Sequence, residues 1–248
     1  MSSRKMIEAA PEAQVSQNEV CNEKAVRPRG YFITLEGGEG AGKSTQLKHL
    51  VERLQQAGVH AIGTREPGGS PGAEILRQVL LSGAIKPLGA AAEAILFAAA
   101  RIDHIDQTIE PALRAGAWVV SDRFADSTRA YQGARGLDPT FLRALERVTL
   151  DGLRPALTLI LDLPPEEGLA RADRRRRPSE PLDPFENETL EFHQNLCAAF
   201  RAIAEAEPDR CVLIDAAGSE AEVAQAIWDV VSHRFPVQLL PREGALDA

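Results

Sequence analysis

The feature that most constrains this chain is the glycine-rich stretch GGEGAGKST, residues 37–45, which directly follows the apolar run YFITLE. It fits the pattern G-x-x-x-x-G-K-[ST], with a predicted strand before it and a predicted helix after it. Glycines there permit backbone torsions that let successive N–H groups turn inward around a phosphate, and the next helix adds its positive end. A merely flexible turn would not need the lysine and the hydroxyl, so we expect a site for a nucleoside triphosphate.

This stretch assigns a first set of binding residues. Lys43 is expected to reach the β- and γ-phosphates, and the Ser44 hydroxyl is expected to bind Mg²⁺. The expected ATP-binding residues are Gly37, Gly38, Glu39, Gly40, Ala41, Gly42, Lys43, Ser44 and Thr45.

Strand and helix patterns alternate from residue 31 to the C-terminal region. The expected strands are YFITLE, VHAIGT, WVVSD, LTLILDL and CVLIDA. The near-continuous apolar run of LTLILDL is typical of a strand covered by helices on both faces. The predicted order β-α-β-α-α-β-α-β-α-β-α implies parallel strands with right-handed crossovers, and therefore a three-layer α/β fold. Within the helical pattern of residues 91–116, Pro111 is a position at which a helix can kink.

Length and composition suggest one domain with a tail. The chain has 248 residues, 44% of them hydrophobic, enough for one substantial core. Residues 1–28 are polar and without a clean period, so we expect a flexible tail, followed by a single domain over residues 29–248. No apolar stretch approaches the roughly 20 residues of a membrane span, and no secretion signal is recognisable, so a cytoplasmic protein is expected. Three cysteines without C-x-x-C spacing indicate reduced thiols.

The charge distribution bears on partners. A formal net charge of −8 argues against a broad basic face that grips nucleic acid. The exception is RADRRRR, residues 171–177, which carries five arginines in seven positions. Such a run is as readily a solvated helix face as a functional element.

A GTPase switch is one alternative for a phosphate-binding chain. Switches of that kind carry an N-K-x-D sequence that reads guanine, and none of the four asparagines begins one. The sequence DAAG at Asp215 resembles a switch motif but lies too near the C-terminus to precede such a reader. We therefore discount this class.

A phosphoryl-transfer enzyme needs a second anionic substrate in line with the γ-phosphate. Asp122 and Arg123 stand at the C-terminal end of the predicted strand WVVSD, the edge at which ligands collect in parallel sheets. Arg123 could hold a monophosphate bidentately, and Asp122 could position Mg²⁺ or Arg123. The alternative is a purely structural ion pair.

A base-binding surface is suggested by Phe97 and Arg101, which are four residues apart and share one helix face. An aromatic ring beside a guanidinium suits a flat base with a carbonyl. Ser127, Thr128 and Tyr131 project from neighbouring parts of one helix and could line the same pocket. Ordinary core packing and helix capping are the alternatives for these side chains.

The segments EGGEGAGKST, TREPGG, FAAAR, SDRFADSTRAYQGARGLD and LDLPPEEGLARA resemble, in order and spacing, those of bacterial thymidylate kinases. The resemblance runs from about residue 31 to the C-terminal helix. TREPGG and DRxxxSxxAYQG are its specific motifs, because the phosphate loop alone is shared with many other proteins.

The resemblance implies a P-loop nucleoside monophosphate kinase that transfers the γ-phosphoryl of ATP to dTMP, with Mg²⁺, as a homodimer supplying dTTP synthesis. It implies that Lys43, Asp122 and Arg123 are catalytic, and that Ser44 and Asp122 hold the metal. Glu39 would meet the 3′-hydroxyl, and Tyr131 would crowd the 2′ position. The implied dTMP-binding residues are Glu39, Arg65, Phe97, Arg101, Arg123, Thr128, Tyr131 and Gln132.

The family divides on whether a catalytic arginine lies in the phosphate loop or in a lid. Here the loop reads Glu39-Gly40-Ala41, without arginine. The arginine run therefore resembles a lid at about residues 171–186, with Arg174, Arg175, Arg176 and Arg177 as the candidates. Pro184 stands where the family usually has arginine. Two alternatives stay open from sequence: another nucleoside monophosphate kinase of this fold, and a non-catalytic ATP-binding regulator.

Overall fold

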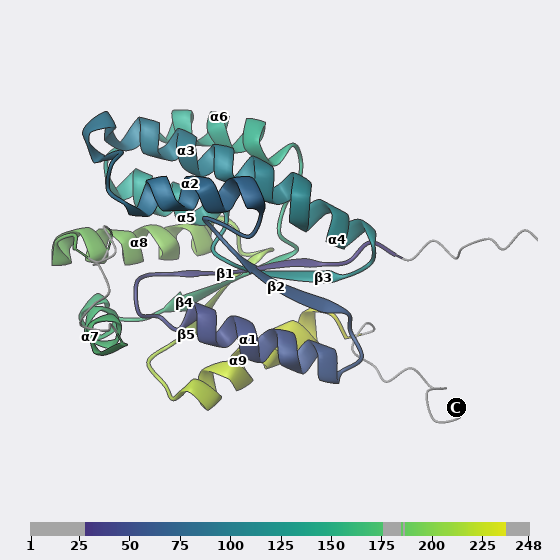
Figure 1. Cartoon of the computed structure of the whole chain (residues 1–248). Coiled ribbons are helices and arrows are strands. Elements are labelled where there is room, and N and C mark those ends of the chain that lie inside the picture. Colours follow the sequence, from purple (N-terminus) through teal and green to yellow (C-terminus); the bar gives the residue numbers. More distant parts are fainter. Residues whose placement is uncertain (1–27, 176–184, 186, 237–248) are drawn as a thin grey trace, which may run out of the picture.

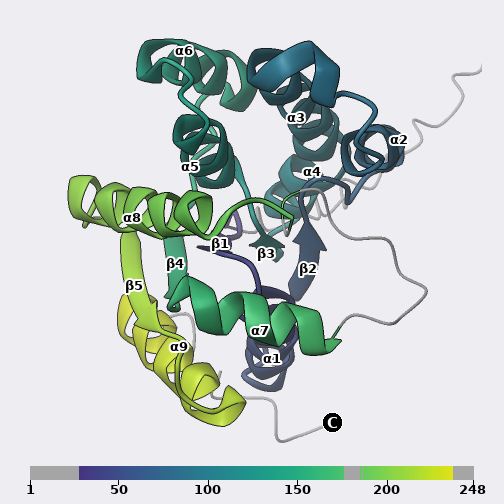
Figure 2. The ribbon, with the colours of Figure 1, turned by 90° about the vertical axis from the view of Figure 1, so that its left-hand side faces the viewer.

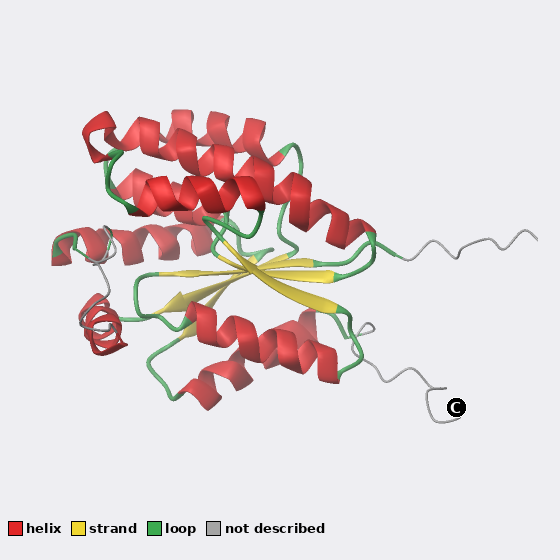
Figure 3. Ribbon diagram, in the orientation of Figure 1, coloured by secondary structure: helices red, strands yellow, loops and turns green. Residues whose placement is uncertain are grey.

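The computed structural model describes residues 28–175, 185 and 187–236. Its centre is a five-stranded parallel sheet in the order β2-β3-β1-β4-β5 (Figure 3). The strands are β1 (Phe32–Gly37), β2 (Ala61–Arg65), β3 (Trp118–Asp122), β4 (Leu157–Asp162) and β5 (Cys211–Asp215). Each corresponds to a run predicted from sequence, so the expected parallel α/β sheet is confirmed.

Helices cover both faces of the sheet (Figure 1). On one face lie α1 (Lys43–Gln56) and α9 (Glu220–Arg234). The other face carries α2 (Pro71–Leu81), α3 (Gly89–His104), α4 (Glu110–Arg114), α5 (Ala125–Ala134), α6 (Pro139–Leu150) and α8 (Leu190–Ala206). Figure 2 looks onto the end of the sheet where α7 (Pro165–Arg175) lies. The three predicted layers are present.

The core follows from the two-sided cover of the central strands. All six residues of β1 are buried, and the side chains of β4 alternate between two cores. Leu159 packs with the core under α1 and α9, whereas its neighbour Ile160 packs with the aromatic cluster under α5 and α8. Each fully buried aliphatic side chain of this kind stabilises the fold by roughly 1.5–3 kcal/mol. The central strands therefore form a rigid base for the loops at their carboxyl ends.

The predicted element order missed two helices. Between β3 and β4 the chain forms α5 and α6, where one helix was expected, and between β4 and β5 it forms α7 and α8. Local capping explains the first break, because the Asp138 side chain accepts a hydrogen bond from the Thr140 amide at 2.7 Å and Pro139 stands at the first turn of α6. Thr189 likewise caps α8, accepting from the amide of Phe192 at 3.2 Å.

The helical segment expected around residues 91–116 departs from α geometry before its proline. A π-helical turn spans Ile105–Ile109 and precedes α4, which carries Pro111 in its first turn. Proline lacks an N–H and crowds the preceding turn, and the wider turn ahead of it accommodates both effects. The departure from α geometry therefore lies at Ile105–Ile109, several residues before the position at which the sequence predicted a kink.

Three further expectations can be compared with the structure. The predicted tail at 1–28 lies almost wholly outside the described residues, as do residues 176–184 and 186 of the predicted lid. Cys197 and Cys211 are free thiols, both buried. In the part of the chain that is described, no single helix is long and apolar enough to cross a membrane, although Pro71–Leu81 and Lys86–Arg114, bent by 84°, pass that test as a pair.

Candidate active site

The glycine-rich loop connects β1 to the first turn of α1. Gly40 and Gly42 have φ values of 66° and 92°, in the left-handed region that glycine tolerates. At Gly40 an added Cβ would lie 1.9 Å from the carbonyl oxygen of Gly168, so the loop packs backbone to backbone against α7. The Lys43 ammonium donates to the carbonyls of Gly38 at 2.7 Å and Gly37 at 3.1 Å. The loop therefore curls around its own lysine, beside the helix that leads into the predicted lid.

Arg123 projects from the end of β3 with an unusual backbone. Its φ is 72°, which costs a non-glycine residue roughly 1–2 kcal/mol. Its amide donates to the Leu35 carbonyl at 2.9 Å, and its own carbonyl accepts from the Ser121 hydroxyl at 2.8 Å. The next amide, that of Phe124, donates to the Glu36 carboxylate at 2.8 Å. Bonds on both sides hold this conformation, as is typical where strain aims a functional side chain.

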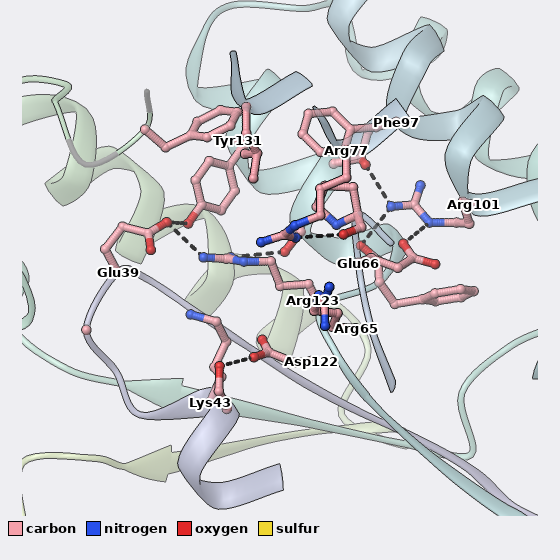
Figure 4. A pocket seen from close by; sticks show the side chains of 18 of the residues that line it. Glu39, Lys43, Arg65, Glu66, Arg77, Phe97, Arg101, Asp122, Arg123 and Tyr131 are labelled. Carbon is pink, nitrogen blue, oxygen red and sulfur yellow. Dashed lines mark hydrogen bonds and ion pairs between the residues drawn. The ribbon is translucent and has the colours of Figure 1, made fainter. Parts of the chain in front are cut away.

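The Arg123 guanidinium reaches back to the glycine-rich loop (Figure 4). Its Nη1 donates to the Gly37 carbonyl at 3.2 Å and to the Ser127 hydroxyl at 3.3 Å, while Nη2 donates to the Glu39 carboxylate at 2.8 Å. The Tyr131 hydroxyl donates to the same Glu39 oxygen at 2.5 Å. Among the described residues, Nε has no partner. Nε and the second hydrogen of Nη2 can thus hold an oxyanion side-on.

Charges in this cluster shift one another's pKa values. Burial alone would raise the pKa of Glu39, but Arg123 and Lys43 outweigh it and lower that pKa to about 2. Burial, together with the positive charge of Arg123, lowers the pKa of Lys43 to about 8. Glu39 is therefore ionised at neutral pH. An anionic ligand beside Lys43 would favour its charged form, so binding of polyphosphate and protonation of the lysine reinforce each other.

The other end of the cavity is lined by the residues expected to bind a base. The Arg101 guanidinium donates to Glu66, to the Phe124 carbonyl and to Thr128. Phe97 lies near Phe185, with ring centroids 6.1 Å apart. The buried Gln132 amide lies 3.4 Å from Glu93.

Most of the predicted site residues line one cavity of about 220 Å³. It brings together Glu39, Gly40, Gly42, Lys43, Ser44, Arg65, Phe97, Arg101, Asp122, Arg123, Ser127, Thr128, Tyr131, Gln132 and Arg175. The remaining loop residues, Gly37, Gly38, Ala41 and Thr45, do not line it, although the carbonyls of the first two bond Lys43.

The described arginines of residues 171–177 have different environments in the structure. Arg171 donates to the carbonyls of Ala216 and Ala217, and so ties α7 to the loop after β5. Arg174 is exposed, and its Nε donates to the Ala170 carbonyl at 3.1 Å. Arg175 lines the cavity. Arg176 and Arg177, also predicted as catalytic candidates, lie outside the described residues, as does Pro184.

A candidate metal position lies at the start of α1. The Ser44 hydroxyl donates to the Asp122 carboxylate at 2.5 Å, so two hard oxygen ligands meet at one point. Mg²⁺ prefers such oxygens and commonly keeps several waters besides. The described ranges contain no cluster of three or more His, Cys, Asp or Glu side chains arranged to hold a metal. The residue pair present here suits a magnesium ion that is held largely by nucleotide phosphates.

The resemblance implies that residues 64–69, which include Glu66, form the floor between the two phosphate sites, but Glu36, Arg77 and Phe185 were not predicted as part of this site. Glu66, Arg77 and Phe185 line the cavity. Glu36 and Glu66 are buried carboxylates, with 0% and 6% of the residue exposed. A glutamate that ends the buried run YFITLE is a usable signal, because a buried carboxylate needs partners. The hydrogen-bond partners of these carboxylates come from distant segments, and no local sequence pattern predicts them.

Glu36 makes stability depend on pH. Burial, followed by the nearby Asp126 charge, raises its pKa from an ordinary 4.5 to about 8, although Ser127 and Phe124 donate hydrogen bonds to it. Between these two values the folded chain keeps a proton that the unfolded chain has released, so stability falls as pH rises through this window.

We expect Glu36→Gln, which resembles the protonated acid, to match the wild type near pH 5. By pH 9 it should be more stable by an amount on the order of a few kcal/mol. Urea unfolding at pH 5, 7 and 9 measures the difference. A difference that stays constant with pH would contradict this assignment.

Comparisons with known proteins agree with the geometry. The thymidylate kinase family model matches residues 35–227. A thymidylate kinase of Bradyrhizobium sp. (strain ORS 278) is 58% identical over 208 residues, covering 84% of this chain and 92% of the relative. A thymidylate kinase of Afipia carboxidovorans is 54% identical over 218 residues, covering 88% and 95%.

A solved structure is similar as well. The crystal structure of thymidylate kinase from Ehrlichia chaffeensis superposes with a TM-score of 0.67 at 30% identity, covering 82% of this chain and all of that one. With the family model matched over most of the described residues and relatives above half identical, the chain belongs to the thymidylate kinase family, enzymes that use ATP to phosphorylate dTMP to dTDP.

Proposed function

We propose that this chain carries out the family's reaction by holding ATP and dTMP end to end, with the glycine-rich loop and Lys43 on the ATP phosphates and Arg123 on the dTMP phosphate. The observation that carries the proposal is the bond from Arg123 Nη1 to the Gly37 carbonyl, at 3.2 Å. Through that contact Arg123, the proposed ligand of the dTMP phosphate, lies directly beside the phosphate loop. Catalysis of phosphoryl transfer is chiefly positioning and charge stabilisation, which this arrangement supplies.

The residues that line the rest of the cavity are proposed to bind the nucleoside of dTMP. Phe97 would stack on thymine, Arg101 would donate to its carbonyl, and Thr128 and Gln132 would lie near the base. Glu39 would accept from the 3′-hydroxyl, and Tyr131 would fill the space of a 2′-hydroxyl. Arg65 would border the acceptor phosphate. The hydrogen bonds of Glu39 with Arg123 and Tyr131 support this, because they hold the three side chains of the proposed sugar and phosphate site in one cluster.

Mg²⁺ is proposed as the cofactor, with Ser44 and Asp122 as the protein's contribution to its coordination sphere. When bound, it would screen the charge of the phosphates. The role of this chain's residues is to orient it: the hydroxyl starts α1, and the carboxylate ends β3. Their contact at 2.5 Å supports a shared position.

We propose that the positive charge that stabilises the transition state comes from the lid region. Among the described arginines of that region we assign this role to Arg175. The loop residues Glu39, Gly40 and Ala41 offer no cation of their own. Arg175 lines the cavity from the end of α7, whereas Arg174 bonds its own helix.

The two arginines form a matched pair of variants. Arg175→Ala should lower kcat by about 100-fold or more with little change in the KM for ATP, since charge stabilisation acts mainly at the transition state. Arg174→Ala, which removes a neighbouring arginine at equal cost in helix propensity, should stay within about threefold of wild type. Steady-state kinetics with both substrates varied measures the pair. Equal losses in the two variants would contradict the assignment to Arg175.

A homodimer is proposed through an apolar face formed by α2, α3 and α6, which pack side by side (Figure 1). The face exposes large apolar side chains that solvent would not favour. They are Ile75 and Val79 on α2, Ile95 and Ile102 on α3, Phe141 and Val148 on α6, and Leu88 in the short 3-10 helix Lys86–Leu88 that precedes α3. A second copy of the same face would bury them in a closed two-fold contact.

Sedimentation should give twice the monomer mass, and Val148→Asp should shift it to monomer, whereas Leu213→Asp on β5 should not.

The proposed domain organisation is a single kinase domain over residues 29–248 in the cytoplasm, with a lid at about 171–186. The backbone contact between the phosphate loop and α7 supports a coupling between loop and lid.

A substrate panel tests the proposed function. ADP release is measured with dTMP, dUMP, dCMP, dGMP and AMP as acceptors. We expect dTMP to be preferred, with dUMP next. A preference for any of the other three would indicate a different monophosphate kinase, and tight ATP binding without transfer would indicate a regulator.

A further inference from the structure

The guanidinium of Arg101 is fixed by three hydrogen bonds. Nε donates to Glu66 at 2.7 Å, and Nη2 donates to the Phe124 carbonyl and the Thr128 hydroxyl, both at 3.1 Å. A guanidinium carries five N–H donors, so these bonds leave the two on Nη1. Within the described part of the chain Nη1 has no hydrogen-bond partner, and it keeps some accessible surface. Because Arg101 lines the cavity, Nη1 is its group available to a ligand.

Behind Arg101 lies a second layer of buried polar side chains. One Glu66 oxygen accepts from Arg101, and the other lies 3.0 Å from His104 Nδ1. His104 Nε2 in turn lies 2.6 Å from the Thr64 hydroxyl. The side chains of Glu66 and His104 are only 4% and 0% exposed. Since a carboxylate paired with Arg101 accepts hydrogen bonds, Nδ1 is the donor to Glu66, and Nε2 is left to bond the Thr64 hydroxyl.

The turn after Glu66 closes tightly over this layer. Gly69 has a φ of 84°, and a Cβ added there would lie 2.4 Å from the Thr64 hydroxyl and 2.5 Å from His104 Nε2. The Gly69 carbonyl accepts from the Thr108 hydroxyl at 2.7 Å. The motif TREPGG therefore supplies Thr64, Glu66 and the glycine that fits over them.

We propose that Glu66 and His104 are positioning residues that aim the free Nη1 donors of Arg101 at the acceptor's base and thereby set the preference for a 4-carbonyl base. The inference rests on the proposed role of Arg101 in reading the base. A fixed donor pair is satisfied by the carbonyl of thymine or uracil. The 4-amino group of cytosine cannot accept these hydrogen bonds, so the donor pair would stay buried and unpaired. An unpaired buried donor is the strongest way for a site to reject an analogue. An arginine free to swing away would lose that penalty.

The test measures the ratio of kcat/KM for dTMP to kcat/KM for dCMP. Glu66→Gln keeps the shape but removes the charge that holds Arg101 and His104. It should lower the ratio by about 10-fold or more, chiefly through the KM of dTMP, with the KM for ATP unchanged. His104→Gln, which can still donate to Glu66 but does not reproduce the rigid bridge to Thr64, should lower it about threefold to tenfold.

A control residue on the first turn of α2 contacts the same turn. Glu74 accepts from the Gly69 amide and from Arg65, both at 2.9 Å, but does not contact Arg101. Glu74→Gln should leave the ratio within about twofold of wild type. A general loosening of the turn would instead lower the rates with dTMP and dCMP together, and leave the ratio unchanged.

The outcomes are separable. If Glu66→Gln folds, as judged by circular dichroism, and keeps the wild-type ratio, the inference is overturned; if it does not fold, the ratio of His104→Gln decides alone. Calorimetric binding of dTMP and dCMP gives the same comparison without catalysis. A wild-type chain that fails to phosphorylate dTMP would contradict the proposed function, whereas equal weakening of both nucleotides in the variants would contradict only the positioning role.

Discussion

Replacing Arg123 by alanine is expected to lower kcat/KM for dTMP by about 10³-fold. The side chain would make two charge-assisted hydrogen bonds to the acceptor phosphate, each contributing about 1.5–3 kcal/mol when bonded to a charged group. The effect should fall on both KM and kcat, because the same bonds keep the phosphate in line with ATP. The KM for ATP should change much less than the KM for dTMP, since Lys43 keeps its own bonds to the carbonyls of Gly37 and Gly38 when Arg123, which shares the Gly37 carbonyl, is removed.

Arg123→Lys is the matched control for this experiment. It keeps the positive charge and the strained backbone position, but a point charge cannot reproduce the two-pronged contact. Its kcat/KM for dTMP should reach about one tenth of the wild-type value or more. The alanine variant should melt below the wild type, because Glu39 loses its ion-pair partner, so circular dichroism is needed to show that it is folded at the assay temperature. Unchanged dTMP affinity in Arg123→Ala would show that the acceptor phosphate binds elsewhere.

Replacing Lys43 by methionine is expected to lower kcat by about 10³-fold. Removing one charged donor from a developing phosphoryl oxygen costs roughly 10²–10³ in rate, and here the donor is also buried. Methionine keeps most of the apolar stem, and burial of the ammonium already lowers its pKa to about 8, so the fold should tolerate the neutral side chain.

Lys48 provides the control, because it lies on the same helix and is exposed. Lys48→Met should retain wild-type kinetics within about twofold. Steady-state assays and a melting curve for each variant separate catalysis from stability. A Lys43→Met enzyme with near wild-type kcat would contradict the proposed contact between this lysine and the transferred phosphoryl.

The sequence was sufficient wherever local chemistry decides the outcome. The buried runs became strands because helices cover both sheet faces, and the glycine-rich loop curls around Lys43 because its torsions are reserved for glycine. Phe97 and Arg101 share a face of α3 and line one cavity, as their spacing predicted.

The sequence was insufficient where residues far apart satisfy one another. Arg101 meets Glu66 across 35 positions, and Glu36 meets Ser127 across 91. Such pairs follow from the sheet order, which the strand pattern does not specify. The π-helical turn before Pro111 was likewise not predicted, since the sequence pattern places the irregularity at the proline itself.

The most direct test of the account is a crystal structure with dTMP and a non-hydrolysable ATP analogue bound together. We predict that Nε and Nη2 of Arg123 lie about 3 Å from the dTMP phosphate oxygens, with that phosphate facing the γ-phosphate held by Lys43. A dTMP phosphate bound elsewhere, with Arg123 still on Glu39 and turned away from it, would contradict the central claim that Arg123 presents the acceptor to the phosphate loop.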